Sequence, residues 1–303
     1  MRFPVTKEAH PMSNANHHPR RFAAAAEVRE ALKSTDYLAD AAIANAVFLS
    51  DALGKPLLLE GPAGTGKTEL AVAVAAATGS RLIRLQCYHG IDEARALYEW
   101  DYRKQLLAIQ SAEASTDAGL ESVFSEKYLL SRPLLDAVRA DEPVVLLIDE
   151  VDQLDVEAEA LLLEFLSSYQ VTVPELGTVR ARITPLVFLT SNDNRELSDA
   201  LKRRCLYLHI GYPTPERECD IIRARVPGID AELATRVAET VAVLRTLDLK
   251  KRPSVSETLD WARTLLLIGA TEVTDSLVSE HANVLLKHQT DITMVRERLA
   301  TVS

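Results

Sequence analysis

The hydrophobic residues of this 303-residue chain are spaced in two ways. Up to about residue 211, short runs of consecutive apolar residues, typical of strands buried on both faces, alternate with stretches that carry an apolar residue every three or four positions, typical of helices. Beyond residue 211 only the helical spacing continues. The pattern predicts an α/β part built on a parallel sheet, followed by an all-helical part of roughly ninety residues.

Five stretches have the pattern of strands in this sheet. They are 56–60, 81–87, 144–148, 183–190 and 205–210. Between them we expect two helices over 22–53 with a break near 34–36, a helix over 69–77, an amphipathic helix with its apolar stripe from 158 to 169, and a short helix over 197–201. Two segments interrupt the alternation: 88–125, which we interpret as a helix broken by an insertion, and 170–181, which we interpret as a hairpin.

After residue 211 the chain carries helix-start signals and no strand signals. Thr214 with Pro215 predicts one helix start, and Ser254 with Glu257 forms a capping box that opens a helix through 267. Further helices are expected around 277–286 and 292–299. We therefore divide the chain into a disordered tail (1–21), an α/β domain (22–211) and a helical lid domain (212–303).

Composition narrows the class of protein. A net charge of −10 leaves no basic footprint across the chain, so we expect no nucleic-acid partner, and no apolar run is long enough to cross a membrane, so we expect no membrane span. The expected tail is rich in proline and contains three histidines, but clustered Cys or carboxylate partners for a metal are missing from its sequence. Three cysteines without paired spacing favour the reducing cytoplasm over a disulfide framework.

The strongest motif is a phosphate loop of the form G-x-x-x-x-G-K-[ST] between the first strand and the helix over 69–77. Its glycines let backbone N–H groups face a β-phosphate, its lysine reaches the β- and γ-phosphates of ATP, and its threonine hydroxyl is a ligand for Mg²⁺. The loop residues are Gly61, Pro62, Ala63, Gly64, Thr65, Gly66, Lys67 and Thr68.

Two further strands end in polar residues that fit the same chemistry. The run 144–148 leads into Asp149 and Glu150. We expect Asp149 to hold the Mg²⁺ ion and Glu150 to deprotonate the attacking water. The strand over 183–190 leads into Asn192, which we interpret as a γ-phosphate sensor rather than as part of a turn. Ligands of open parallel sheets bind at these strand ends.

Weaker candidates lie on either side of the sheet. Tyr37 and Leu38 precede the phosphate-loop strand, where a base contact is possible, although we favour a contact between helices. Lys202, Arg203 and Arg204 precede the last strand; they are either a solvated helix end or a source of a cation for the γ-phosphate of a neighbouring subunit.

These motifs together resemble AAA+ ATPases, and among them the MoxR family. The resemblance covers roughly residues 35–286 and rests on GPAGTGKT, VVLLIDEVD, the hairpin stretch EAEALLLEFLSSYQVTVPELGTVRA, FLTSND and RELSDALKRRCLYLHIGYP. The stretches LQCYHGIDEARALYEWDYRKQLL, RPLLDAV and KRPSVSETLDW are similar to a subgroup called CoxD-like, ATPases associated with maturation of carbon monoxide dehydrogenase.

The resemblance implies an AAA+ core with a helix-2 insert and a pre-sensor hairpin, followed by the lid. It also implies a homo-oligomeric ring, commonly a hexamer, with a von Willebrand A domain partner and a metalloenzyme client, here a molybdenum hydroxylase. By position Arg204 matches the family's arginine finger, with Arg203 adjacent. Where many members have a lid arginine in a Ser-Pro-Arg motif, this chain has Ser254-Val-Ser256, and Arg252 is an unassigned substitute.

We therefore expect a cytoplasmic Mg²⁺-dependent ATPase that remodels a metalloenzyme during its maturation. One alternative is an ATP-switched adaptor that binds a partner and hydrolyses ATP slowly. Another is a DNA-dependent AAA+ machine, which the acidic total and the missing basic recognition element disfavour.

Overall fold

A computed structural model describes residues 18–110, 124–174 and 176–302 of the chain. Its middle part is a five-stranded, fully parallel sheet with strand order β2-β5-β8-β1-β9. The strands are β1 (Leu57–Glu60), β2 (Arg81–Gln86), β5 (Val144–Asp149), β8 (Leu186–Ser191) and β9 (Leu206–His209). The prediction of an α/β fold on a parallel sheet is confirmed.

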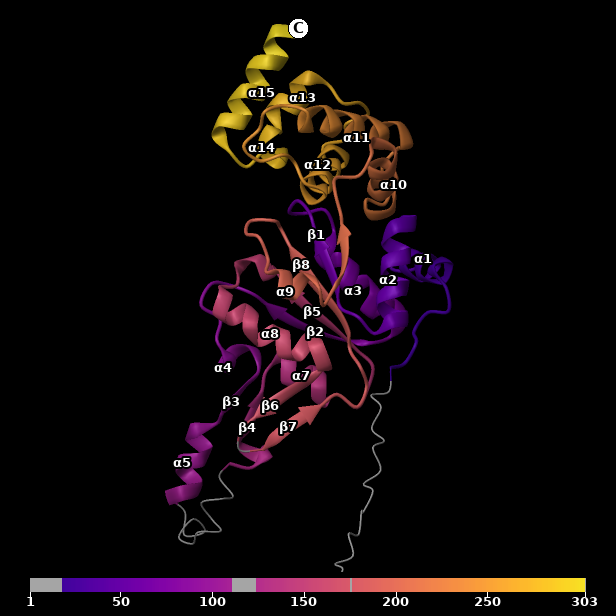
Figure 1. Cartoon of the computed structure of the whole chain (residues 1–303). Coiled ribbons are helices and arrows are strands. Elements are labelled where there is room, and N and C mark those ends of the chain that lie inside the picture. The colour runs from indigo at the N-terminus through magenta and orange to yellow at the C-terminus, as the bar shows by residue number, and fades with distance from the viewer. Residues whose placement is uncertain (1–17, 111–123, 175, 303) are drawn as a thin grey trace, which may run out of the picture.

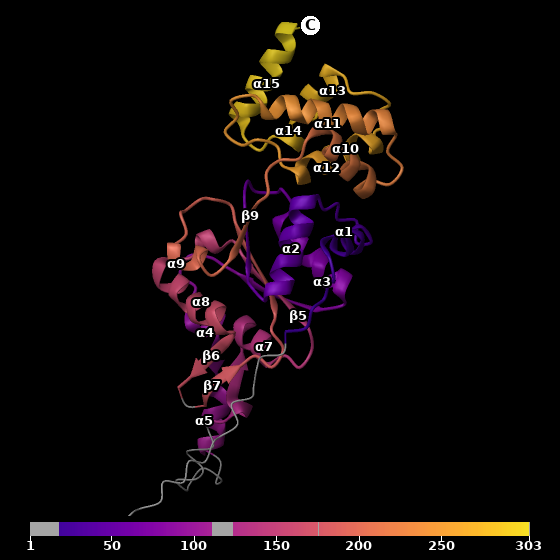
Figure 2. The ribbon, with the colours of Figure 1, turned by 45° about the vertical axis from the view of Figure 1, so that its right-hand side comes forward.

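Alternate residues of the strands enter two separate hydrophobic cores. Leu57 and Leu59 pack with α1 (Ala25–Lys33), α2 (Ala41–Leu53) and α3 (Lys67–Thr78), whereas Leu58 packs on the opposite face. That opposite face is covered by α7 (Pro133–Arg139) and α8 (Val156–Ser168). Figure 2 shows the two groups of helices on either side of the sheet. Because both faces are covered, the three inner strands β1, β5 and β8 are apolar and buried along most of their length, whereas the edge strands β2 and β9 also carry exposed polar residues.

The helices on the α1–α3 face begin and end where local signals place them. The α1–α2 break falls at residues 34–40, and the Asp40 side chain accepts a 2.8 Å hydrogen bond from the Ile43 N–H at the start of α2. Gly54 ends α2 with a positive φ of 60°. The two helices predicted over 22–53 are therefore confirmed.

The segment after β2 differs from the interrupted helix that we expected. It contains α4 (Glu93–Ala96), β3 (Tyr98–Trp100), α5 (Tyr102–Gln110), the 3-10 turn η2 (Glu126–Tyr128) and β4 (Leu129–Ser131). Strands β3 and β4 form a small antiparallel ladder, which places Tyr98 and Trp100 on a strand. The insertion expected within 88–125 falls largely at 111–123, outside the described residues.

The stretch between β5 and β9 follows the predicted order. After the 3-10 turn η3 (Val151–Gln153) and α8, strands β6 (Gln170–Val173) and β7 (Gly177–Arg180) form the expected antiparallel hairpin. The short α9 (Asp199–Lys202) precedes β9. In Figure 1 the hairpin and α5 lie at the end of the molecule opposite the C-terminal helices.

Residues from 215 onward form a helical unit with its own core, which we call the lid. Its helices are α10 (Pro215–Arg225), α11 (Ala231–Arg245), α12 (Val255–Leu267), α13 (Asp275–Glu280), α14 (Ala282–Leu285) and α15 (Gln289–Val302). The lid core surrounds the fully buried Trp261 and draws on all six helices. Both predicted starts are present: the Thr214 side chain caps α10, and Ser254 with Glu257 forms the capping box of α12.

A buried ion pair joins three parts of the lid. Arg245 on α11 donates to both carboxylate oxygens of Glu218 on α10, at 2.5 and 2.8 Å, and both side chains are almost fully buried. The Arg245 Nε also donates to the Pro253 carbonyl at 2.8 Å, one residue before the cap of α12. The guanidinium lies 4.5 Å from the Tyr212 ring centroid. Arg245 therefore sets where α12 begins relative to α10 and α11.

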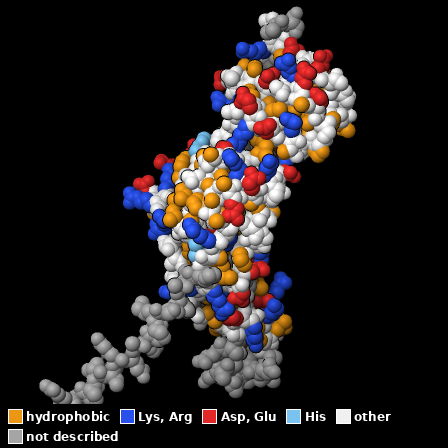
Figure 3. Space-filling model, turned by 90° about the vertical axis from the view of Figure 1, so that its right-hand side faces the viewer, with side chains coloured by type: hydrophobic (Ala, Val, Ile, Leu, Met, Phe, Trp, Pro, Cys, Tyr) orange, Lys and Arg blue, Asp and Glu red, His pale blue; other side chains and the backbone are white. Residues whose placement is uncertain are grey.

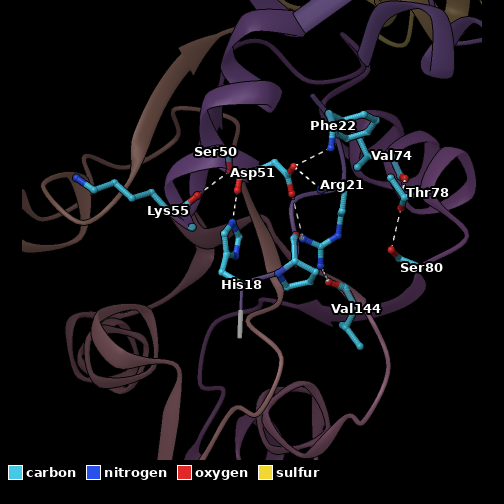
Figure 4. Close-up of polar contacts among 12 residues, drawn as sticks. His18, Arg21, Phe22, Ser50, Asp51, Lys55, Val74, Thr78, Ser80 and Val144 are labelled. Carbon is cyan, nitrogen blue, oxygen red and sulfur yellow. Dashed lines mark hydrogen bonds and ion pairs between the residues drawn. The ribbon is translucent and has the colours of Figure 1, made fainter. Parts of the chain in front are cut away.

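Residues 18–24 pack against the α1–α3 side, although we expected the tail to extend to 21. Asp51 on α2 is fully buried, and its carboxylate accepts hydrogen bonds from the Arg21 guanidinium and from the Arg21 and Phe22 N–H groups, as Figure 4 shows. Arg21 also donates to the Val144 carbonyl at the start of β5. The His18 ring lies against the Asp51 carbonyl, whereas His10 and His17 lie outside the described residues.

The surface mixes charge and hydrophobic side chains. Figure 3 faces the α1–α2 side, where hydrophobic side chains gather near the middle of the molecule while charges of both signs cover the lid. No helix in the described ranges is long and apolar enough to cross a membrane. The three cysteines are free, Cys87 being buried and Cys205 and Cys219 half-buried. Burial raises the pKa of the Cys87 thiol to about 12.

Candidate nucleotide-binding site

The phosphate loop lies between β1 and α3, and its glycines are required by its shape. Gly61, Gly64 and Gly66 have positive φ values of 145°, 72° and 94°. A Cβ atom on Gly61 would lie 2.2 Å from the Ile210 carbonyl oxygen, and one on Gly64 would lie 2.4 Å from the Ser254 Cβ. The loop is therefore pressed between the end of β9 and the start of α12, where only glycine fits.

Lys67, at the start of α3, is folded back onto this loop. Its Nζ donates to the Gly61 and Pro62 carbonyls, both at 2.7 Å, and its side chain is buried. Burial lowers the pKa of Lys67, and the nearby carboxylates of Asp152 and Asp149 oppose that change. The ammonium thus lies in the curve of the loop, where a phosphate oxygen could replace the carbonyls as its partner.

Asp149, the last residue of β5, is buried and fully engaged. Its Oδ1 accepts hydrogen bonds from the Thr68 hydroxyl at 2.9 Å and from the Thr190 hydroxyl at 2.5 Å. Its Oδ2 accepts from the Arg84 guanidinium at 2.5 Å. The adjacent Thr68 and Asp149 oxygens are hard donors of the kind that Mg²⁺ binds, so the two residues predicted as metal ligands fit that ion.

Glu150 follows with an unusual backbone. Its φ of 58° lies in the left-handed region, a conformation that costs a non-glycine residue about 1 kcal/mol or more and is found preferentially at functional sites. Its N–H donates to the Thr190 hydroxyl at 2.9 Å, and its carboxylate accepts from the Gln86 amide at 3.0 Å. The Thr190 hydroxyl is therefore hydrogen-bonded to both Asp149 and Glu150.

These residues surround a polar cavity of about 310 Å³. It is lined by Ala63, Gly64, Gly66, Lys67, Thr68, Glu69, Asp149, Glu150, Thr190, Asn192 and Ser256. Asn192 reaches it because β8 lies between β5 and β1, so that residue 192 leaves the sheet beside the phosphate loop. Lys67, Asp149, Glu150 and Asn192, predicted from three separate motifs, are thus brought together; their roles remain predictions.

A second cavity, of about 380 Å³, adjoins the first. It lies between the α1–α2 connection, the phosphate loop, the end of β9 and the lid, and Tyr37, Leu38, Ile43, Ile210 and Leu259 are among its lining residues. Gly64, Gly66, Glu69 and Ser256 line both cavities and mark their junction. Tyr37 and Leu38 therefore line a cavity, whereas we had favoured a contact between helices over a contact with a base. Tyr37 also packs against the hydrophobic core on the α1–α3 side.

The lid touches the phosphate loop directly. The Val255 N–H at the first turn of α12 donates to the Gly64 carbonyl at 3.1 Å. Two ion pairs join α10 to the α/β part: Arg217 donates to Asp40 at 2.6 Å, and Arg225 pairs with Glu69. The first turn of α12 presents Ser256 to both cavities, at the position where the family pattern has arginine.

The predicted cations near the last strand and the lid lie away from both cavities. Arg204 donates from Nε to the Ser167 hydroxyl at 2.6 Å and from Nη1 to the Ala200 carbonyl at 2.7 Å, so it lies on the surface beside α8. Arg203 and Arg252 are exposed. None of the three lines either cavity. A contact of Arg204 with nucleotide would therefore have to be made to another subunit.

Several residues of the site carry no motif and were missed. Arg84 and Gln86 share one face of β2, and the β2–β5 register places Gln86 opposite Asp149. Thr190 lies on β8, two residues before Asn192. The buried Asp152 carboxylate accepts hydrogen bonds from the Asn194 backbone N–H and side-chain amide. The polar residues at 84 and 86 were visible in a strand pattern, but their partners depend on strand order.

Comparison with known families agrees with this geometry. Residues 56–205 match the family described as AAA domain, dynein-related subfamily. The α/β part of this chain is an AAA domain. The match spans β1 through Cys205 and thus every α/β residue that lines the polar cavity, which supports an AAA+ ATPase.

Individual relatives of this AAA domain protein are distant. An uncharacterized protein of Staphylococcus haemolyticus is 26% identical over 220 residues, which cover 71% of this chain and 76% of the relative. Among solved structures, the Thermotoga maritima RuvB Holliday junction branch migration motor is 17% identical, with a TM-score of 0.45 over 85% of this chain and 69% of that chain. A mutant of the same RuvB is 18% identical, with a TM-score of 0.46 over 89% and 74%.

Proposed function

We propose that this AAA+ protein hydrolyses ATP with Mg²⁺ in the polar cavity. The N–H groups of the phosphate loop and the Lys67 ammonium bind the β- and γ-phosphates. Thr68 and Asp149 hold Mg²⁺, which neutralises phosphate charge. Glu150 accepts the proton of the attacking water, and Asn192 orients that water or the γ-phosphate. Hydrolysis is thus in-line attack on the γ-phosphorus.

One observation carries this proposal. The polar cavity collects Lys67, Asp149, Glu150 and Asn192 from the ends of three parallel strands, and it adjoins a partly apolar cavity of about 380 Å³. A polar part beside a larger apolar part fits a triphosphate joined to a nucleoside. Glu150 lines this cavity beside Asp149 without a hydrogen bond to the Thr68 hydroxyl that Asp149 binds, which supports a role as the base rather than as a metal ligand.

For the cellular role we propose a MoxR-type ATPase of the CoxD-like subgroup. ATP hydrolysis would drive maturation of a metalloenzyme, a molybdenum hydroxylase such as carbon monoxide dehydrogenase, by a cytoplasmic ring, a hexamer, with a von Willebrand A domain protein. The support is the resemblance of the motif set, together with the position of Arg204 on the surface outside its own cavity. Neither nucleic acid nor membrane is a partner in this proposal.

The catalytic proposal is tested with two cavity variants and one control. Glu150→Gln should bind ATP with nearly unchanged affinity but hydrolyse it at least about a hundredfold more slowly, because it lacks the base. Lys67→Ala should lose ATP binding. Glu157→Gln, an exposed position on α8, should match wild type in both assays. Equal turnover by Glu150→Gln and wild type would refute the role of Glu150.

The ring is tested by mixing subunits. Arg204→Ala and Glu150→Gln subunits should each be inactive alone, and a mixture should regain activity if Arg204 completes a neighbour's cavity. Recovery is expected because some interfaces then combine an intact Glu150 with an intact Arg204. Activity that stays at the level of the separate variants at every ratio would argue against a contribution in trans.

An ATP-switched adaptor with only slow hydrolysis is a second candidate, and the β2 side chains favour it. Arg84 pairs with Asp149 and Gln86 binds Glu150, so both carboxylates are engaged by a neighbouring strand. If these contacts persist in the ATP form, ATP turnover stays slow with or without a partner. Turnover with and without the von Willebrand A domain protein separates the candidates: a motor is strongly stimulated, whereas an adaptor binds its partner in the ATP form and stays slow.

A further inference from the structure

The lid supplies cations to the nucleotide cavities from α10. Among the described residues that line the two cavities, the cations are Lys67 on the phosphate loop and Arg217 and Arg225 on α10. The first turn of α12, which touches the phosphate loop, presents Val255 and Ser256 instead. A positive charge that the lid brings to a bound polyphosphate must therefore come from one of the two α10 arginines.

Arg217 is committed to holding the lid in place. Its Nη1 donates to the Asp40 carboxylate at 2.6 Å and its Nη2 donates to the Leu38 carbonyl at 2.9 Å. Asp40 is in turn the cap of α2. Because both terminal nitrogens are engaged on the α1–α2 connection, Arg217 positions the lid against that connection.

Arg225 is placed differently. It lies in the last turn of α10, its side chain is about one-third exposed, and its partner is Glu69. Arg225 is a lining residue of both the apolar cavity and a third cavity of about 390 Å³ on the lid side. A single ion pair at a half-exposed position contributes little to stability, so moving this arginine onto another anion is easy.

The partner of Arg225 marks the part of the nucleotide that it would meet. Glu69 follows Thr68 in the first turn of α3, where the helix N-terminus favours an anion. Glu69 is also one of the four residues shared by the two cavities. A nucleotide that fills both cavities passes this junction with its α- and β-phosphates, because its base lies on one side and its γ-phosphate on the other.

We propose that Arg225 is a polyphosphate-binding residue of the lid, held beside its site by Glu69 when no nucleotide is bound. Binding of ADP or ATP draws the guanidinium from the Glu69 carboxylate, to which it donates one hydrogen bond, to the α- and β-phosphates, which carry more negative charge and can accept two. The lid then contacts the α- and β-phosphates through Arg225 on α10 rather than through α12. This inference rests on the proposed ATP site.

The test compares nucleotides that differ only in their phosphates. Binding of ADP, ATP and adenosine is measured by calorimetry for wild type, Arg225→Ala, Arg225→Lys and Arg223→Ala. Arg223 is exposed on the same helix and serves as the control. Arg225→Ala should weaken ADP and ATP binding about tenfold or more and change adenosine binding less than about twofold, with Arg225→Lys in between.

Glu69→Gln separates phosphate binding from mere attachment of the lid. If Arg225 binds phosphate, removing the competing carboxylate should tighten ADP binding several-fold, opposite in sign to Arg225→Ala. If the pair only attaches the lid, both substitutions should weaken ADP binding alike, which would overturn the inference. The same Glu69→Gln substitution is also made in Arg225→Ala. There it should tighten ADP binding less than in wild type, because only the repulsion between Glu69 and the phosphates is removed and no arginine is released.

The remaining outcomes are also decisive. Equal ADP affinity of Arg225→Ala and Arg223→Ala would refute the inference while leaving the ATP site intact. An equal loss for ADP and adenosine would assign Arg225 to the base cavity or to folding instead. A wild-type protein that binds neither ADP nor ATP would refute the proposed function and this inference with it.

Discussion

The buried pair of Arg245 and Glu218 gives the sharpest prediction for the stability of the lid. Arg245→Ala leaves the fully buried Glu218 carboxylate without its two hydrogen bonds and removes the bond to the Pro253 carbonyl. Removing one partner of such a pair costs about 3–5 kcal/mol, because the remaining charge stays buried. Since a folded domain is stable by only about 5–15 kcal/mol, this loss should unfold much of the lid at moderate urea.

The assay uses Trp261, which is fully buried in the lid core. In a Trp100→Phe background it is the one remaining tryptophan of the chain, so its fluorescence during urea unfolding reports the lid. The control is Arg236→Ala on the same helix, whose pair with Glu239 at 3.1 Å is exposed on both sides and contributes about 0.2–1 kcal/mol. A second variant, Arg245→Met with Glu218→Leu, should recover most of the loss because no buried charge remains.

Unfolding of Arg245→Ala at the same urea concentration as Arg236→Ala would contradict the predicted cost of the unpaired Glu218 carboxylate. A double variant as unstable as Arg245→Ala would also contradict it, because lost packing rather than a buried charge would then account for the loss. A loss confined to the lid signal would agree with the separate lid core. A simultaneous loss in the α/β part would mean that the two parts unfold as one unit.

Two further substitutions probe the site itself. Gly61→Ala should destabilise the protein and abolish ATP binding, because its Cβ would lie 2.2 Å from the Ile210 carbonyl oxygen at a φ of 145°. Thermal unfolding measures the stability and calorimetry the ATP binding. Gly79→Ala, whose Cβ would meet no atom within 4 Å, is the milder control. Wild-type ATP affinity in Gly61→Ala would contradict the predicted clash. Arg84→Ala should lower the Mg²⁺ concentration for half-maximal ATPase activity about fivefold. The half-exposed Arg84 donates a charge-assisted hydrogen bond to Asp149 that competes with the metal and contributes about 1 kcal/mol. Titration with Mg²⁺, with the exposed Arg81→Ala on the same strand as control, measures this, and an unchanged or higher requirement would refute competition.

The sequence predicted the features that are local along the chain. The phosphate loop, the strand ending in Asp149 and Glu150, the hairpin at 170–181 and the α12 capping box each depend on residues a few positions apart. Parallel strands end at one edge of the sheet, so the convergence of Lys67, Asp149 and Asn192 on one cavity followed from the fold class.

What the sequence could not predict depends on distant contacts. Arg225 and Glu69 are 156 residues apart, and Arg84 meets Asp149 only because β2 lies beside β5. The three-residue strands β3 and β4 are too short for a periodic pattern, so their ladder was hidden within an apparent helix. The attachment of residues 18–22 required knowing that Asp51 is buried, which its place in a helix sequence does not reveal.

The hydrogen bond between α12 and the phosphate loop joins two main-chain atoms, the Val255 N–H and the Gly64 carbonyl. Replacing the Val255 side chain with alanine keeps this donor, so an alanine substitution at this position would not reveal the hydrogen bond. Proline is the exception, since at the first position of a helix it removes the donor without disturbing the helix. Any chain with proline at this position would lack this hydrogen bond between the lid and the phosphate loop.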